Sequence, residues 1–356
     1  MRGEAGLTRP PKPLAEVEGL RYVDRIVCHE VGMPKRILIA SIIAASATLA
    51  AVAQQQPLPR TPGDTQPGRK WTEEQLKQAV SGVRAGRKLT PRSWPNGARV
   101  AVALTFTLNN SANMFARADS AVVQLTGGEF GAVTGLPRLL DVLDRQNVPA
   151  TFFVAATAAI ADPQMIPAIV KRPRHEVGVL GWSDENALTI DSAAEEERLL
   201  AKATDIVAKA AGRKPVGARG PSSVLSPHTM GILKKAGFLY DSTLMGMDEP
   251  YEVLLNGQPS GIVELPVSRL LDDQPTLTAP RFGPSTLPSP ELVFETFRDD
   301  FDAAYQEGTL FLLTLHPHLI GMRSRIGHLD DFIAYMKSKP NVWFATAADI
   351  ARQVKP

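Results

Sequence analysis

Short apolar runs alternate with amphipathic segments along the chain from about residue 94 onward. The runs at 99–106 (RVAVALTF), 150–155 (ATFFVA), 176–180 and 310–315 are rich in β-branched and aromatic side chains, as buried strands are. Residues 136–146 (LPRLLDVLDRQ) place apolar side chains at helical spacing and predict an amphipathic helix. Because a helical segment follows each apolar run, the pattern predicts a parallel sheet covered by helices.

Helix starts and shorter strands complete this alternation. Ser192 and Glu195 form a capping-box pattern ahead of an amphipathic helix. An N-cap acceptor followed by proline, a combination that favours the first turn of a helix, occurs at Asp162-Pro163, Ser226-Pro227 and Ser289-Pro290. Shorter strands are predicted at 216–219, 241–244, 262–267 and 342–346.

Seven or eight strand–helix units indicate the α/β class and predict a distorted (β/α)7-8 barrel that is closed or nearly closed. An open, doubly wound sheet is the alternative. No Gly-x-Gly-x-x-Gly motif follows the first strand, and the sequence has no Walker-type loop. The usual nucleotide-binding reasons for an open sheet are therefore missing.

The first 53 residues have the composition of an export leader. In residues 33–53 (MPKRILIASIIAASATLAAVA), two basic residues precede an apolar run that ends in the small-x-small pattern of a cleavage site. This predicts a signal peptide, with an uncleaved membrane anchor as the alternative. The run is short for a bilayer span, so no stable membrane span is expected in the mature chain. Residues 1–32 lie upstream of Met33, which we expect to be the initiator.

Three further segments follow the signal peptide. Residues 54–69 are rich in proline, glutamine and glycine and predict a flexible linker. Residues 70–93 predict a helix and a connector, with Thr72 and Gln75 as a capping box. Residues 94–356 form the predicted barrel domain.

Charge and cysteine content narrow the function classes. Residues 1–53 carry seven basic and five acidic residues, which leaves 32 of each for 54–356. A balanced domain has no broad field that attracts phosphates, so no nucleic-acid partner is expected. The one cysteine, Cys28, lies upstream of the cleavage site, so the mature chain has no disulfide and no thiolate site. Together with the leader, this predicts a secreted, periplasmic protein.

Polar and glycine-containing segments follow the predicted strands, at the ends where (β/α) barrels carry their chemistry. In order they are 107–109 (TLN), 179–186 (VLGWSDEN), 219–222 (RGPS), 240–242 (YDS) and 315–317 (LHP). This ordered set resembles the NodB homology domain of polysaccharide deacetylases (carbohydrate esterase family four), most of all its peptidoglycan-deacetylase-like and allantoinase-like branch. Segments 94–99, 135–140, 150–154 and 248–251 strengthen the resemblance, which spans about 94–350.

The resemblance implies hydrolysis of acyl amides with zinc or another divalent metal. A typical member has two aspartates after the first strand, one a base and one a ligand, and two histidines four residues apart after the third. The matching positions here are Thr107, Asn109, Leu180 and Asp184. Leucine cannot bind a metal and threonine cannot act as a carboxylate base, so no cofactor is expected.

The spacing of the histidines also argues against a zinc site, without reference to any family. No two of the five histidines downstream of the leader are four residues apart; they are His175, His228, His316, His318 and His328. His316 and His318 are the closest pair, and Pro317 separates them. A single acid or hydrogen-bonding histidine is the commoner role for such a residue than metal binding.

The resemblance also assigns roles to three other residues. His316 aligns with the general acid, Arg219 with the arginine that orients the base aspartate, and Asp241 with the aspartate that holds the imidazolium. Each has a structural alternative. His316 could bond a loop carbonyl, Arg219 could form an ion pair with Asp241 or Asp184, and Asp241 could be a cap or turn residue.

Further candidate site residues lie in the loop after the third strand. Asp184 and Glu185 are adjacent acids that can serve as acid or base without a metal, although Asp184 is also a typical cap. Trp182 either stacks on a sugar or packs in the barrel. The expected substrate contacts are Thr107, Asn109, Trp182 and Pro221. After the sixth strand, Asp272 and Asp273 either face the same mouth or form a solvated turn.

Two functions remain open from the sequence. In the first, the protein hydrolyses a non-peptide C–N bond of a carbohydrate or a related small amide, with little or no metal. In the second, it is an inactive relative that binds an envelope glycan without cleaving it. The sequence does not indicate an oligomeric state.

Overall fold

The structure, a computed structural model, describes residues 67–278 and 289–355. The leader, the signal peptide and the linker as far as residue 66 lie outside the described residues. Within the described part, no helix has the length and hydropathy needed to cross a bilayer. The linker prediction extends three residues too far, because a short 3-10 helix, η1 (Pro67–Lys70), begins there and Trp71 N donates to Gly68 O at 3.1 Å.

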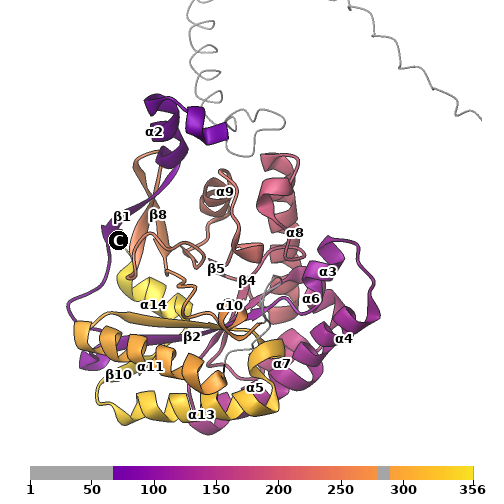
Figure 1. The fold of residues 1–356 in the computed structure, drawn as a ribbon, viewed down its shortest axis with the longest axis vertical. Helices are drawn as coiled ribbons and strands as arrows, with labels where there is room; N and C mark the ends of the chain where they lie inside the picture. Colours follow the sequence, from indigo (N-terminus) through magenta and orange to yellow (C-terminus); the bar gives the residue numbers. More distant parts are fainter. Residues whose placement is uncertain (1–66, 279–288, 356) are drawn as a thin grey trace, which may run out of the picture. The chain divides into compact units, whose positions relative to one another are not determined.

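In the part of the chain that the structure describes, seven parallel strands curl into an incomplete barrel, which confirms the predicted α/β barrel class (Figure 1). In their order around the barrel they are β2 (Val100–Leu108), β3 (Thr151–Val154), β4 (Glu176–Val179), β5 (Gly217–Ala218), β6 (Tyr240–Asp241), β8 (Gln258–Glu264) and β9 (Leu310–Leu315). Strand β9 returns to pair with β2 along its whole length. An additional parallel strand, β10 (Val342–Phe344), pairs with the start of β2.

The barrel closes between β8 and β9 by a narrow junction, which we call the seam. A single parallel bridge joins Asp272, in the segment after β8, to Thr314 of β9. Beside it, Thr314 N donates to Leu271 O at 2.8 Å. Among the described residues, β8 and β9 share no ladder of their own. The seam therefore brings residues after β8 next to the end of β9.

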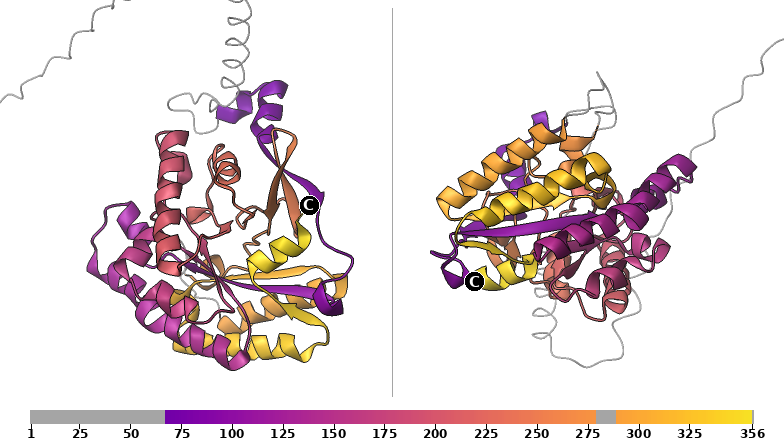
Figure 2. Two further views of the ribbon diagram at one scale, coloured as in Figure 1. Left: turned by 180° about the vertical axis from the view of Figure 1, so that it is seen from behind. Right: turned by 90° about the horizontal axis from the view of Figure 1, so that it is seen from below.

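Helices cover the outside and the amino end of the barrel (Figures 1 and 2). They are α3 (Ala112–Ala116), α4 (Val122–Phe130), α5 (Leu136–Gln146), α6 (Ala156–Ala161), α7 (Met165–Val170), α8 (Ala193–Ala211), α9 (Thr229–Ala236), α10 (Asp273–Leu277), α11 (Pro290–Glu307), α12 (Pro317–Ile320), α13 (Arg323–Ser338) and α14 (Ala347–Val354). Helix α11 packs on β9, and α13 contacts both α11 and α5.

The strongest sequence patterns predict these elements closely. All nine residues of β2 are buried, and the bounds of α5 and β9 are those predicted from the apolar pattern. The Ser192 hydroxyl accepts a hydrogen bond from Glu195 N at the start of α8, as the capping pattern predicts. Ahead of the barrel, Thr72 and Gln75 form the predicted reciprocal capping box of α2 (Glu73–Ser81).

An antiparallel hairpin on the sheet is missing from the sequence prediction. Strand β7 (Tyr251–Leu255) turns into β8 through Asn256 and Gly257, whose φ angles are 50° and 76°. Asn-Gly between two strands is a strong hairpin pattern, since both central residues of the tight turn need positive φ. The predicted strand at 262–267 is thus displaced: β8 begins at 258 and ends at 264.

The connector after α2 is also a strand. Residues 83–88 form β1 (Val83–Lys88), which pairs antiparallel with β7 at the edge of the sheet. Its sequence, VRAGRK, lacks the apolar alternation of a half-buried strand because much of it is exposed. Main-chain pairing with β7 therefore determines its conformation more than its own side chains do.

Candidate active site

An open pocket of about 620 Å³ lies at the carboxyl ends of the barrel strands. This volume lies within the range typical of small-molecule sites. Its polar and charged lining comes from the loops after β2, β4, β5, β6, β8 and β9, and the charged or titratable members are Arg117, Asp184, Arg219, Arg269, Asp272 and His316. The predicted convergence of strand ends thus produces one pocket in the structure.

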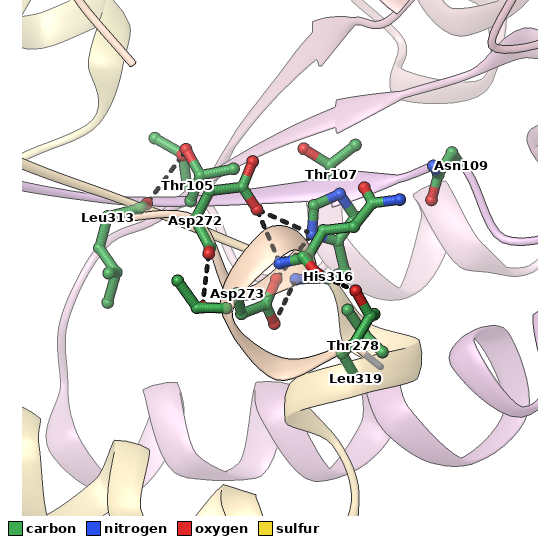
Figure 3. Close-up of polar contacts among 12 residues, drawn as sticks. Thr105, Thr107, Asn109, Asp272, Asp273, Thr278, Leu313, His316 and Leu319 are labelled. Carbon is green, nitrogen blue, oxygen red and sulfur yellow. Dashed lines mark hydrogen bonds and ion pairs between the residues drawn. The ribbon is translucent and has the colours of Figure 1, made fainter. Parts of the chain in front are cut away.

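His316 is buried at the base of this pocket and is held by a carboxylate (Figure 3). Its Nδ1 lies 2.7 Å from Asp273 Oδ1, and its backbone N donates to Asp273 Oδ2 at 3.0 Å. Asp272 Oδ1 lies 3.7 Å from the same Nδ1. Because Nδ1 is engaged, Nε2 is the ring nitrogen left for a ligand in the pocket.

The surroundings of His316 favour its charged form. Burial alone would lower its pKa, but Asp273, together with the more distant Asp272, raises the pKa of His316 above the usual 6.5. Burial raises the pKa of the Asp273 carboxyl, against the opposing attraction of the His316 imidazolium. His318 behaves in the opposite way, since burial and the charge of His316 lower its pKa to about 3. Only His316 of this pair is thus prepared to carry a proton.

The pairing of Asp273 with His316 corrects two sequence expectations. Asp272 and Asp273 do not form a solvated turn: Asp272 caps α10, with Oδ1 accepting from Gln274 N at 2.8 Å, and Asp273 is fully buried. The imidazole is held by Asp273, whereas Asp241 was expected to hold it. The seam explains this, because it brings Asp273 beside His316 across 43 residues of sequence.

Arg219 lies under the pocket and donates to hydroxyl and carbonyl oxygens. Its guanidinium donates to Thr107 Oγ1 at 3.2 Å, to Thr105 Oγ1 at 3.0 Å, and to the carbonyl and hydroxyl of Ser242. The expected ion pair with Asp241 or Asp184 is absent from the described residues. Burial lowers the pKa of Arg219 to about 10, which still leaves it charged at neutral pH. Thr107 Oγ1 accepts from this cation, so its own proton remains for a pocket ligand.

Asp184 links three of the strand-end loops. Its Oδ2 accepts from Asn109 Nδ2 at 3.0 Å, and its Oδ1 accepts from Ser222 N at 2.6 Å. The Ser222 hydroxyl also donates to Asp184 O, which helps hold Asp184 at a φ of 55°. Backbone strain of this kind persists where surrounding contacts fix it. Asp184 and Asn109 therefore line the pocket, as expected, with both carboxylate oxygens of Asp184 already bonded.

Three other predicted site residues lie outside the pocket lining. Glu185 accepts hydrogen bonds from Trp182 N and Ser183 N, so it shapes its own loop. The Trp182 ring packs against the core and has Lys202 Nζ 3.5 Å from its centroid. Pro221 packs close to Gly181, where an added Cβ would lie 2.9 Å from its ring. Sequence position cannot distinguish these loop-forming roles from substrate contact.

Asp241 is paired with a second acid that the sequence did not single out. Both Asp241 and Glu264 are fully buried, and Asp241 Oδ2 and Glu264 Oε2 have no hydrogen-bond partner of another kind among the described residues. Burial raises the pKa of Asp241 to about 6, and burial together with Asp241 raises that of Glu264 well above its usual range. One proton shared between the two carboxyls satisfies both oxygens.

We expect Asp241→Asn to change the pH dependence of stability but not that of activity. The folded-state pKa of Asp241 lies above its ordinary 3.8, so its contribution to stability is present below that pH and is lost as the pH rises through about 6. Asparagine does not titrate, which removes a slope of about 1.4 kcal/mol per pH unit over that interval. Urea unfolding from pH 4 to pH 8 measures this slope. If the pH dependence of activity also shifts, Asp241 influences the pKa of His316 directly, which would contradict the arrangement in the structure.

Neither group of possible ligands in this pocket has the chemistry of an ordinary zinc site. The three positions where the family holds its metal, here Asn109, Leu180 and Asp184, offer one carboxylate, Asp184, and both its oxygens are bonded. Asp272, Asp273 and His316 bring ligand atoms within 4.8 Å of one another. There, however, Nδ1 and Asp273 Oδ1 lie at hydrogen-bonding distance, so a shared proton fits this cluster better than a divalent ion.

Comparisons with known proteins agree with this architecture. The family model for polysaccharide deacetylases matches residues 122–240. A peptidoglycan deacetylase of Helicobacter pylori is 28% identical over 253 residues, which cover 64% of this chain and 86% of that protein. The crystal structure of the allantoinase PuuE aligns with a TM-score of 0.65 at 26% identity, over 75% of this chain and 93% of that one.

The mycobacterial comparison identifies the family. A Mycobacterium smegmatis protein, assigned as a polysaccharide deacetylase, aligns with a TM-score of 0.67 and 35% identity. The alignment covers 74% of this chain and 93% of the mycobacterial chain. Since fold and sequence agree over nearly all of that relative, this chain belongs to the polysaccharide deacetylase family.

Proposed function

We propose that the protein hydrolyses a non-peptide C–N bond, the acyl amide of an amino sugar or of a related small amide. His316 acts as the general acid, and the reaction needs no zinc at the position usual for the family. The observation that carries the proposal is the contact of 2.7 Å between His316 Nδ1 and the buried carboxylate of Asp273. An imidazolium charged in this way is suited to protonate a poor leaving group such as an amine.

Asp272 is the carboxylate best placed to activate water. Asp184 has both oxygens bonded and Glu185 faces its own loop, whereas Asp272 lines the pocket and uses Oδ1 for its cap. Its Oδ2 accepts no hydrogen bond from the described residues. This leaves one carboxylate oxygen, next to the acid, that can take a proton from water.

Together these groups account for a balanced reaction. Water oxygen attacks the acyl carbon while Asp272 takes a proton from it, and the Thr107 hydroxyl, polarised by Arg219, donates to the developing oxyanion. His316 then gives its proton to the amide nitrogen as the C–N bond breaks. The products are a carboxylic acid and a free amine, and the proton held by Asp272 returns to His316, which restores both groups for the next turnover.

The test combines metal analysis with an acetate-release assay on the full chain. We expect less than one zinc per ten chains by elemental analysis and release of acid from acetylated sugars or opening of cyclic ureides. Activity should survive chelation and should not rise when zinc is added. Stoichiometric zinc together with chelator-sensitive activity would overturn the metal-independent mechanism.

The second candidate is glycan binding without hydrolysis. It is favoured by Thr107 at the family's base position and by the Asp184 carboxylate being bonded to Asn109 and Ser222. Saturable binding of a glycan, with no acid released from any acetylated sugar or ureide, would support this candidate against the first. The signal peptide predicted at 33–53 favours an envelope glycan as the ligand in this case.

A further inference from the structure

The pocket contains more positive charge than its own acids neutralise. Three arginines line it, Arg117, Arg219 and Arg269, against two aspartates, Asp184 and Asp272. His316, with its raised pKa, adds a further charge that buried Asp273 balances. The excess is local, since residues 54–356 as a whole carry equal numbers of basic and acidic residues.

Two of the three arginines lie at the exposed rim and have no acid to pair with. Arg117 follows α3 and Arg269 follows β8, and both side chains are exposed. Within 67–278 and 289–355, neither has a carboxylate oxygen within 4.0 Å; Arg117 donates only to Met114 Sδ, at 3.5 Å. Elsewhere on the same surface, exposed arginines such as Arg145 and Arg198 do form ion pairs.

Neither aspartate of the pocket forms an ion pair with these two arginines in the described residues. Asp184 is bonded to Asn109 and Ser222, and Asp272 caps α10 beside His316. A cationic rim above a pocket of this volume attracts and orients an anionic ligand, and a guanidinium matches a carboxylate in geometry.

We infer that the substrate is an anion and that Arg117 and Arg269 bind its carboxylate at the rim. The inference builds on the function proposed above and names its substrate class: an acyl amide that also carries a carboxylate. Two sources share this chemistry, namely an acidic amino sugar and an acidic ureide. A neutral acetylated sugar would leave both guanidinium groups unpaired.

Calorimetric titration of the full chain tests this without requiring turnover. The probes are N-acetylmuramic acid and hydantoic acid, each compared with its own methyl ester, which keeps the amide and removes the charge. For at least one pair we expect the acid to bind about tenfold more tightly than its ester. The acid that shows the preference identifies the source, and the preference should shrink as salt is raised from 0.05 M to 0.5 M.

The double variant Arg117→Gln/Arg269→Gln should reduce the acid-to-ester ratio to about one. Arg92→Gln is the matched control: Arg92 is exposed, does not line the pocket, and precedes the amino end of β2. It should keep the wild-type ratio. Equal affinities for acid and ester, or a preference that survives the double variant, would overturn the inference. If the protein prefers the acid to the ester but releases no carboxylic acid from it, the proposed hydrolysis is wrong and the inference about the anionic ligand stands.

Discussion

His316→Ala should lower the rate of amide hydrolysis by about 10²–10⁴-fold, the range typical of a lost general acid. His318 is not placed to replace it, because burial lowers the pKa of His318 and its side chain is not part of the described pocket lining. Steady-state acid release measures the effect. In the wild type, kcat/KM should fall as the pH rises above the raised pKa of His316.

His228→Ala provides the matched histidine control. His228 precedes α9, is half-buried and does not line the pocket, so its removal should change the rate less than twofold. Circular dichroism before and after heating establishes that both variants fold. Retention of more than a tenth of wild-type activity in folded His316→Ala would refute the assignment of the acid.

Asp273→Asn should affect both stability and the pH profile, because Asp273 is fully buried and bonded twice to His316. Removing one partner of a buried ion pair typically costs about 3–5 kcal/mol. His316 has a raised folded-state pKa, so its stabilising contribution is present below pH 6.5 and is lost as the pH rises through that folded pKa. The penalty should therefore be largest below pH 6.5 and should shrink as the pH rises through the raised pKa of His316.

The same substitution should move the alkaline limb of the activity profile to lower pH, since the charge that raises the pKa of His316 is gone. A residue with only a packing role would lower activity equally at all pH values. Asp330→Asn, which breaks an exposed ion pair with Arg145, is the control and should cost less than about 1 kcal/mol. An unshifted limb in Asp273→Asn would contradict the proposed charging of His316.

Elements with a strong apolar pattern could be predicted from the sequence alone. Strand β2 and helix α5 bury most of their apolar residues against the core, so burial and periodicity determine them. Strand β1 could not be predicted in this way, since main-chain pairing with β7 holds a largely polar segment. The turn between β7 and β8, by contrast, has the Asn-Gly sequence typical of a hairpin, with positive φ at both residues.

The candidate site was predicted in part. Four residues at or after predicted strand ends were expected to meet, because parallel strands end on the same side of a barrel. They do line one pocket in the structure: Thr107, Asp184, Arg219 and His316. The partner of His316 could not be read from spacing, since Asp241 and Asp273 both follow strands and differ only in which loop reaches β9. No pattern in the sequence measures that reach, which depends on the bridge between Asp272 and Thr314.

The seam has a consequence for how the protein matures. His316 follows β9 and Asp273 begins α10, so the proposed acid and the carboxylate that raises its pKa lie on opposite sides of the seam. In a chain whose seam has not formed, His316 lacks this carboxylate, and its imidazole has an ordinary pKa. His316 therefore reaches its raised pKa, and holds its proton at neutral pH, only once the seam has formed.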